Sequence, residues 1–423
     1  MIDYTSFLSR AGEQMQGSAI RRMGTVLAQA HDIISFAPGY PAPETFAWED
    51  FQAIGRELLS GADGNVLQYG PTRGYRPLLE EIAAIMARRG APTDPDRLLV
   101  TTGSQQGLDL LARVLLDPGD VVLVELATYT GAITAFRNVQ AQMEGVRQDP
   151  DGIDLEDLDN VYLRLVRDGR RARVLYVVPN FQNPTGLLMS LPKRLALLDW
   201  AARRDVLILE DDPYRELYFE DSATEADVRP IRADDTEGRV VYLSSFSKTL
   251  APGFRVAWLD APAPLAARFE VAKQAEDLCT GGLDQRVVYE AAHRGILDRQ
   301  LPILRAHYQA KRDVMIRALH DQFGDEVTWP APRGGFFLWV TMHGGLDGEA
   351  MIPRAVRNGV IYVAGEAFFV NGAGRNIIRL AFSAPTPERI IEGVARLART
   401  VREETAETIS LAPATRSARP AAR

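Results

Sequence analysis

Short apolar segments alternate with helical patterns along the middle of the chain, and this alternation restricts the possible folds more than any other feature. The helical patterns lie at Ser104–Leu116, Thr130–Asn138, Leu191–Arg204 and Ala266–Ala275. The apolar segments have the length and composition of buried strands, and they cover Leu98–Thr101, Val121–Glu125, Val174–Val178, Val206–Glu210, Val240–Leu243 and Arg255–Leu259. Strands separated by helices imply parallel pairing. The sequence therefore predicts an α/β fold with a mainly parallel sheet flanked by helices.

The pattern changes after about residue 285. A long amphipathic helical stretch runs from Gln285 to about Phe323, with a break expected at Pro302. Two strand-like segments follow, Gly334–Val340 and Ile377–Ser383. This combination predicts a smaller α+β domain.

The chain ends differ from its middle in composition. A helix candidate at Ser18–Ala28 precedes a segment rich in Pro and Gly, Phe36–Pro43, which favours a turn or an extended conformation. The last residues, from Ile409, are rich in Ala, Pro, Arg and Ser and are expected to be disordered. We therefore expect an N-terminal arm that reaches the small domain and the substrate site, a large domain, a small domain and a tail, at residues 1–45, 46–300, 301–408 and 409–423.

Composition excludes several classes of protein. The 423 residues are 46% apolar and 25% charged, which is ordinary for a soluble globular protein. The net charge of −8 argues against a nucleic-acid partner. The single Cys279 excludes an internal disulfide framework and fits a reducing cytoplasm. We expect no membrane span, because no apolar run approaches about 20 residues, and no signal peptide is evident at the N-terminus.

A lysine stands among hydroxyls just after a predicted strand. Lys248 lies within the run Ser244–Arg255, at the mouth of the sheet, where ligands bind in α/β folds. A lysine that forms a Schiff base needs an anionic group held nearby, and Ser245, Ser247 and Arg255 could hold a phosphate. This combination suggests pyridoxal phosphate. The alternative is a surface lysine in a Ser-rich loop.

Two further segments at strand ends could bind parts of such a cofactor. Gly103 permits a tight turn, after which Ser104 and Gln105 open a helix whose free N–H groups form an anion site. The alternative for Ser104 is an ordinary N-cap. Tyr129 could stack on a cofactor ring, or it could be a core tyrosine.

Polar side chains also follow the next two strands. Asn183 precedes a proline, so its backbone is extended and its amide can reach a ring oxygen; the alternative is a plain turn. The acids of the segment Glu210–Tyr214 are costly at the end of an apolar strand unless they are paired. A pyridinium nitrogen is a suitable partner, and Tyr214 could bind the ring's phenolic oxygen. A capping acid or a metal ligand is the alternative.

Two cationic residues complete the set. Neighbouring cations such as Arg255, together with desolvation, would lower the pKa of Lys248, whose amine could then act as nucleophile and proton shuttle. Arg379 lies inside an apolar strand-like segment and needs an anion. A substrate carboxylate held in a bidentate contact would serve, and a structural ion pair is the alternative.

These residues, in this order, resemble the fold-type I pyridoxal-phosphate enzymes, specifically the class I and II aminotransferases, over roughly residues 15 to 400. The resemblance implies a large domain with a seven-stranded, mainly parallel sheet. It implies that Lys248 forms the Schiff base, that Asp211 pairs with the pyridine nitrogen, and that Tyr129 stacks on the ring. The other implied roles are the ring oxygen for Asn183 and Tyr214, the phosphate for Ser104, Gln105, Ser245, Ser247 and Arg255, and the substrate for Arg379, Asn183 and Gly39.

A narrower resemblance is to the 2-aminoadipate and kynurenine aminotransferases. It rests on Ser18-x-Ile-Arg21, the segment Ser35–Pro43, the segment Leu67–Gly74 and Thr102-Gly-Ser-Gln-Gln-Gly. It implies a homodimer in which Tyr69 reaches the neighbour's phosphate, and a role for Arg21 in reading a distal carboxylate. The sequence departs from this branch at Arg22, at Pro38 and at Gly281-Gly282, so the substrate stays open.

The implied activity moves an amino group between an L-α-amino acid and a 2-oxo acid, with 2-oxoglutarate as a plausible acceptor, by a ping-pong mechanism. A β-lyase, a decarboxylase or an oxidase on the same scaffold is the alternative, because the motifs hold the cofactor without choosing the bond that breaks. A third reading is the effector domain of a transcription regulator, which the acidic chain and the short segment before the matched region disfavour.

Overall fold

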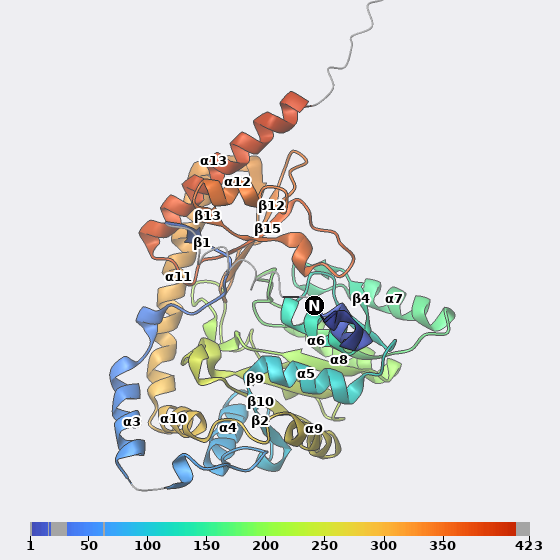
Figure 1. Ribbon diagram of the computed structural model, residues 1–423, viewed down its shortest axis with the longest axis vertical. Coiled ribbons are helices and arrows are strands. Elements are labelled where there is room, and N and C mark those ends of the chain that lie inside the picture. The colour runs from blue at the N-terminus through green and yellow to red at the C-terminus, as the bar shows by residue number, and fades with distance from the viewer. Residues whose placement is uncertain (1, 16, 18–31, 62–63, 412–423) are drawn as a thin grey trace, which may run out of the picture.

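The computed structural model describes residues 2–15, 17, 32–61 and 64–411 (Figure 1). The helix expected at Ser18–Ala28, and Arg21 with it, lies outside the described residues. The last helix, α13 (Pro387–Leu411), continues through Ile409, where the tail was expected to begin. No helix in the described ranges is long and apolar enough to cross a membrane.

A seven-stranded sheet forms the centre of the larger part of the molecule. Its strand order is β2-β10-β9-β8-β7-β3-β4. Strand β10 pairs antiparallel with both of its neighbours, and the other pairs are parallel. The strands are β2 (Leu98–Thr102), β3 (Val121–Glu125), β4 (Gln142–Val146), β7 (Ala172–Val177), β8 (Leu207–Asp211), β9 (Val240–Ser245) and β10 (Val256–Asp260). The predicted mainly parallel sheet is thus confirmed.

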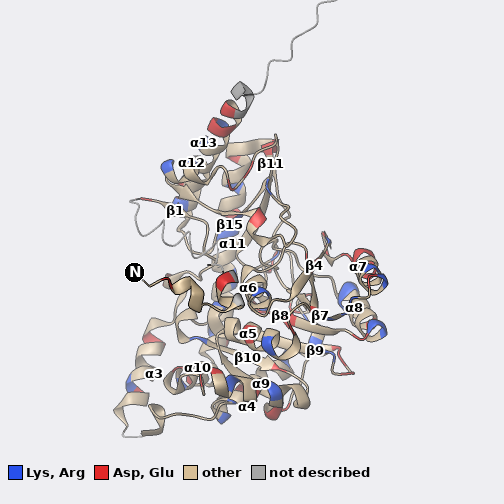
Figure 2. Cartoon of the chain, turned by 45° about the vertical axis from the view of Figure 1, so that its right-hand side comes forward, with Lys and Arg blue, Asp and Glu red and all other residues tan. Residues whose placement is uncertain are grey.

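Helices cover both faces of this sheet because successive side chains of each strand point to opposite faces. Val122 and Val124 belong to the core on one face, which is covered by α5 (Ser104–Leu115), α6 (Thr130–Asn138) and α9 (Ala263–Glu276). Val121 and Leu123 point to the other face. That face is covered by α3 (Trp48–Ser60), α4 (Arg76–Arg88), α7 (Leu155–Arg167), α8 (Leu191–Arg204) and α10 (Gly282–His293). On α7 and α8 acidic and basic side chains are interspersed (Figure 2).

A smaller antiparallel sheet forms the second part. Its order is β11-β12-β15-β14, with β11 (Val327–Thr328), β12 (Phe337–Met342), β15 (Ile377–Ala381) and β14 (Val363–Ala364). The predicted strands at Gly334–Val340 and Ile377–Ser383 correspond to β12 and β15. The sheet shares a core with α11 (Ile296–Phe323) and α13. The short strand β1 (Ile34–Ser35) pairs with β13 (Val360–Ile361), which joins the N-terminal segment to this part. The other α-helices and strands of the described ranges are α1 (Arg10–Gln14), α12 (Ile352–Arg357), β5 (Gln148–Asp149) and β6 (Gly152–Ile153).

The helix break expected at Pro302 is wrong. Pro302 lies inside α11, and the chain breaks instead at Gly295, whose φ of 70° is left-handed. A proline inside a helix costs about 3 kcal/mol, but α11 buries Leu304 and Tyr308 in the core of the smaller part. Burial of several such side chains at about 1.5–3 kcal/mol each outweighs that cost. Glycine accepts the left-handed conformation that ends α10.

Candidate active site

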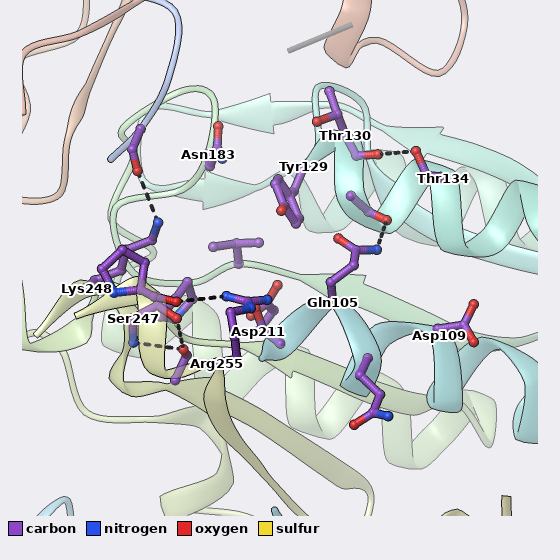
Figure 3. Close-up of a pocket in the computed structure, with 18 of the residues that line it drawn as sticks. Gln105, Asp109, Tyr129, Thr130, Thr134, Asn183, Asp211, Ser247, Lys248 and Arg255 are labelled. Carbon is purple, nitrogen blue, oxygen red and sulfur yellow. Dashed lines mark hydrogen bonds between the residues drawn. The ribbon is translucent and has the colours of Figure 1, made fainter. Parts of the chain in front are cut away.

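A cavity of about 1170 Å³ lies where the carboxyl ends of the parallel strands face the smaller sheet (Figure 3). Of the predicted site residues that the structure describes, all but Tyr69 line it. These are Gly39, Ser104, Gln105, Tyr129, Asn183, Asp211, Tyr214, Ser245, Ser247, Lys248, Arg255 and Arg379. The carboxyl edge of the parallel strands supplies residues such as Asp211 and Lys248, whereas Gly39 and Arg379, which are 340 positions apart, come from the N-terminal segment and the smaller sheet.

One end of the cavity is built to hold an anion. Helix α5 begins after Gly103, which adopts a φ of 75° and supplies no side-chain cap, so the N–H groups of its first turn face the cavity without a capping side chain. The alternative interpretation of Ser104 as an ordinary N-cap is wrong, because Gly103 occupies the N-cap position and Ser104 is the first residue of the helix. A Cβ atom on Gly103 would collide with the guanidinium of Arg255. The hydroxyl of Ser245 lies 2.8 Å from that of Ser247, and both serines line the cavity together with Arg255. Ser247 and Arg255 are drawn close together in Figure 3.

Lys248 is not a surface lysine. It ends the short 3₁₀ turn Phe246–Lys248 that follows β9, and its Nζ donates a 3.0 Å hydrogen bond to the carbonyl oxygen of Gly39. Its Nζ also lies 5.9 Å from the ring centroids of Tyr214 and Phe336. Burial, and then the charges of Arg379 and Arg255, lower the pKa of Lys248 to about 8. About half of this amine is therefore neutral near pH 8, where an ordinary lysine is almost fully protonated.

Asp211 is the acid of the Glu210–Tyr214 segment that faces the cavity. Its Oδ2 accepts a 2.7 Å hydrogen bond from the hydroxyl of Tyr176, and its buried Oδ1 has no partner within the described structure. Burial raises the pKa of Asp211 to about 7. The two adjacent acids are satisfied elsewhere: Glu210 accepts from two backbone N–H groups, and Asp212 accepts from Asn180 and Tyr242.

Asn183 and Tyr214 line the same cavity as Asp211. The Oδ1 of Asn183 accepts a 2.7 Å hydrogen bond from Arg379, and its side chain also hydrogen bonds that of Tyr214. Tyr129 precedes α6 and points into the space between Asn183, Asp211 and Gln105 in Figure 3. Gln105 is fixed there by a 2.9 Å hydrogen bond to the carbonyl oxygen of Gly131.

Arg379 lies in β15, is fully buried and packs against two aromatic rings. Its guanidinium carbon lies 4.3 Å from the ring centroid of Phe337 and 4.9 Å from that of Phe368. It donates to Asn183 and to the carbonyl oxygen of Ala37, and its Nε has no partner. No carboxylate lies within ion-pair distance of it in the described ranges, so the structural ion pair is wrong. Burial lowers the pKa of Arg379 to about 10, and an anionic ligand would compensate this desolvation.

Some expected residues do not meet the cavity. Tyr69 is 79% exposed and lies away from it in the single chain. Gly281 and Gly282 start α10, where a Cβ on Gly282 would meet the carbonyl oxygens of Val66 and Gln68, and neither glycine lines the cavity. The sequence reasoning also missed residues, chiefly Tyr176 and the aromatic pair around Arg379. The sequence holds no signal for Tyr176, because its contact with Asp211 depends on the register between β7 and β8.

The residues present fit pyridoxal phosphate. An unpaired buried carboxylate oxygen, an amine with a lowered pKa and an uncapped helix N-terminus beside an arginine match the pyridinium nitrogen, the aldehyde and the phosphate of that cofactor. The metal-ligand alternative for the Glu210–Tyr214 acids has no support, since the described residues contain no cluster of His, Cys, Asp and Glu that could hold a metal ion.

Comparison with known proteins places these observations in a family. The family model "aminotransferase class I and II" matches residues 34–397. The chain is 39% identical over 404 residues to the aromatic-amino-acid aminotransferase 1 of Thermococcus litoralis, a match that covers 95% of this chain and 96% of that protein.

Two solved structures are similar over nearly their whole length. The kynurenine aminotransferase of Pyrococcus horikoshii, in complex with PMP, is 38% identical with a TM-score of 0.90, covering 95% of this chain and 98% of that chain. The α-aminoadipate aminotransferase of Thermus thermophilus, in complex with N-(5'-phosphopyridoxyl)-L-leucine, is 37% identical with a TM-score of 0.88, covering 96% of this chain and 100% of that one.

Proposed function

The chain belongs to the class I and II aminotransferases, and we propose that Lys248, Asp211 and Arg379 carry out its reaction. It is a pyridoxal-phosphate enzyme that moves an amino group between an amino acid and a 2-oxo acid. One observation supports these roles above others. A single cavity brings together an amine with a lowered pKa, a carboxylate with an unpaired oxygen and a guanidinium with no acidic partner.

Five residues would hold the cofactor's phosphate, namely Ser104, Gln105, Ser245, Ser247 and Arg255. Asp211 would accept from the ring nitrogen, Asn183 and Tyr214 would bind the ring oxygen, and Tyr129 would stack on the ring. When bound, the cofactor supplies an electron-withdrawing ring and a carbonyl group that takes up the amino group. The protein supplies the charges that hold and orient it.

The remaining residues act on the substrate. Arg379 would grip the α-carboxylate in a bidentate contact, with Asn183 and Gly39 beside it. The Nζ of Lys248 would take the proton from the substrate α-carbon and return it in the reverse half-reaction. The two half-reactions follow one another in one site, which predicts ping-pong kinetics.

For the substrates, we propose aromatic amino acids and 2-aminoadipate as donors and 2-oxoglutarate as acceptor. The similar proteins named above act on aromatic amino acids, kynurenine or α-aminoadipate. The volume of the cavity and the aromatic side chains of Tyr40 and Phe337 in its lining support bulky donors. Arg21 would read the distal carboxylate of a dicarboxylate substrate.

We also propose a homodimer in which Tyr69 completes the phosphate site of the partner. Tyr69 and Leu67 are 79% and 76% exposed, which is unusual for large apolar side chains that lie close together in sequence. An apolar groove of about 380 Å³ is lined by Phe46, Trp48, Phe51 and the segment Ala251–Phe254, and it shares Pro252 with the large cavity. We further propose domain boundaries at residues 45 and 300. We also propose a cytoplasmic location, with which the single cysteine is compatible.

A half-reaction screen tests this function. The loaded enzyme is mixed with one amino acid at a time, and the cofactor absorbance and the released 2-oxo acid are recorded; a 2-oxo acid is then added. Phenylalanine, kynurenine and 2-aminoadipate should convert the cofactor in the first step, and 2-oxoglutarate should restore it in the second. Release of carbon dioxide, ammonia or hydrogen peroxide in place of this cycle would contradict the assignment.

A further inference from the structure

We propose that Tyr176 is a positioning residue that favours the carboxylate form of Asp211 and leaves one of its oxygens free to face the cavity. The Tyr176 hydroxyl donates a 2.7 Å hydrogen bond to Oδ2 of Asp211. This contact occupies one carboxylate oxygen and leaves the other, Oδ1, buried without a partner. The inference rests on the proposed pairing of Asp211 with the cofactor's ring nitrogen.

The sheet itself sets this contact. In the β7–β8 ladder, Tyr176 lies opposite Leu209, and Asp211 follows Leu209 by two positions. Residues two apart on a strand share a face, and a diagonal neighbour is within reach of a long side chain. The Tyr176 ring is fully buried and packs edge-on against Phe136 at 5.8 Å. The hydroxyl is therefore held at the acid by two packed strands and a ring contact.

The charge on Asp211 depends on this donor. Burial and the nearby Asp212 favour the neutral acid, whereas the Tyr176 hydroxyl and the more distant Lys248 favour the carboxylate. Burial raises the pKa of Tyr176 well above its usual value, so its hydroxyl stays protonated and always available as a donor. The groups whose charges face Tyr176 are Asp211 itself, Tyr129 and Glu125. Of the two groups that favour the carboxylate, Tyr176 and Lys248, Tyr176 is the one that donates a hydrogen bond to Asp211.

The Tyr176 hydrogen bond should affect the position of the proton shared by Asp211 and the cofactor's ring nitrogen. In the pair formed by Asp211 and a ring nitrogen, the proton lies either on the nitrogen, beside a carboxylate, or on the carboxyl oxygen. A donor at Oδ2 stabilises the first arrangement, because a charge-assisted hydrogen bond is stronger than a neutral one. Loss of the donor should move the proton toward Asp211 and reduce the electron withdrawal by the ring.

Nitrogen NMR of the loaded enzyme tests this directly. Wild type, Tyr176→Phe, Tyr242→Phe and Asp211→Asn are loaded with pyridoxal phosphate carrying ¹⁵N in the ring, and the ring resonance is recorded at one pH. Tyr242→Phe is a matched control, because the Tyr242 hydroxyl is equally buried and donates a 2.9 Å hydrogen bond to the neighbouring Asp212. Replacement of Tyr176 by 4-fluorophenylalanine keeps the volume of the para substituent without a donor, should the phenylalanine variant fold poorly.

We expect the ring resonance of both Tyr176 variants to move toward the position of an unprotonated nitrogen, part of the way to that of Asp211→Asn. Tyr242→Phe should keep the wild-type position, and turnover in the Tyr176 variants should fall about 10-fold or more, as for other supporting residues around a reactive group. A wild-type resonance in the Tyr176 variants, with a shifted one in Asp211→Asn, would overturn the role of Tyr176 and leave that of Asp211. An unshifted resonance in Asp211→Asn would overturn the pairing itself.

Discussion

Lys248 and Asp211 are both moved toward their neutral forms by the same cause. Both groups are desolvated at the end of neighbouring strands, and burial disfavours a charge of either sign. The pKa of the lysine falls to about 8, and that of the acid rises to about 7. In the proposed mechanism, the amine would attack as a neutral nucleophile, and the acid would gain a cationic partner when the ring binds.

The lowered pKa of Lys248 predicts how the cofactor-free protein captures pyridoxal phosphate. An ordinary lysine is protonated below about pH 10.4, whereas this amine loses its proton near pH 8. Stopped-flow absorbance should show a capture rate that rises with pH and levels off above pH 8. Arg379→Gln, which removes one of the two nearby cations, should move the midpoint to higher pH. A rate that still rises steeply at pH 10 would contradict this pKa.

Arg379 is predicted to contribute binding energy through the substrate α-carboxylate. Hydrogen bonds to charged groups contribute about 1.5–3 kcal/mol, so Arg379→Gln should lower kcat/KM by about 10- to 100-fold. The loss should appear for every amino acid that carries an α-carboxylate and should be smaller for the corresponding amine. Arg375→Gln, four residues earlier and 70% exposed, is the control. Equal losses for the acid and the amine would remove Arg379 from carboxylate binding.

At the residue scale, the sequence predicts site residues mainly from polar side chains at the ends of apolar strands. Lys248, Asp211, Asn183 and Arg255 each follow or precede an apolar strand, and polar groups at such places need a partner. Tyr176 lies inside a strand, where tyrosine is common, and only the register between β7 and β8 reveals its contact with the acid. The role proposed for Arg379 also depends on the three-dimensional structure, because only the structure shows that Arg379 has no acidic partner within the described residues.

At the scale of elements, the first turn of α5 can be tested by a single glycine substitution. Gly103→Ala would add a Cβ that collides with Arg255 and would also strain a residue with a φ of 75°. Gly119→Ala is a matched control, because its φ is 90° but no atom lies within 4 Å of the added Cβ. Both should lose about 1–2 kcal/mol of stability from strain, measured by urea unfolding.

The two glycine variants should differ in cofactor binding. Fluorescence titration of the cofactor-free proteins should give a Kd for pyridoxal phosphate that is raised about 10-fold or more in Gly103→Ala, because the displaced guanidinium no longer pairs with the phosphate. Gly119→Ala should keep the wild-type value. Equal affinities in both variants would show that Arg255 and the α5 N-terminus do not form one phosphate site.

Most elements of the fold follow from local patterns, and the exceptions have physical causes. The buried strands of the large sheet are continuous apolar runs, and so they are visible in sequence. Strand β4 lies at the sheet edge and contains Gln142 and Glu144, which hide it among loop residues. A helix break was predicted at Pro302 but occurs at Gly295, because helix propensity says nothing about the tertiary packing that stabilises α11 around Pro302.

At the scale of the whole molecule, two parts of different architecture meet at one cavity, and a second copy is proposed to complete it. Mixed dimers test this arrangement. Chains carrying Lys248→Ala and chains carrying Tyr69→Ala are purified separately, and each homodimer should have little activity. If Tyr69 serves the partner's site, the mixed dimer contains one intact site and activity returns on mixing. If Tyr69 serves its own chain, no intact site forms and mixing restores nothing.

The most direct test of the account is a single-turnover measurement on Lys248→Ala. The variant is loaded with pyridoxal phosphate, mixed with an amino acid that the wild type converts, and followed by cofactor absorbance, with Lys193→Ala as the control lysine. The account predicts that the cofactor still binds, held by the phosphate site and Asp211, while proton transfer from the substrate slows by at least about 100-fold. Wild-type conversion by Lys248→Ala would contradict the assignment of Lys248 as the base on which the mechanism depends.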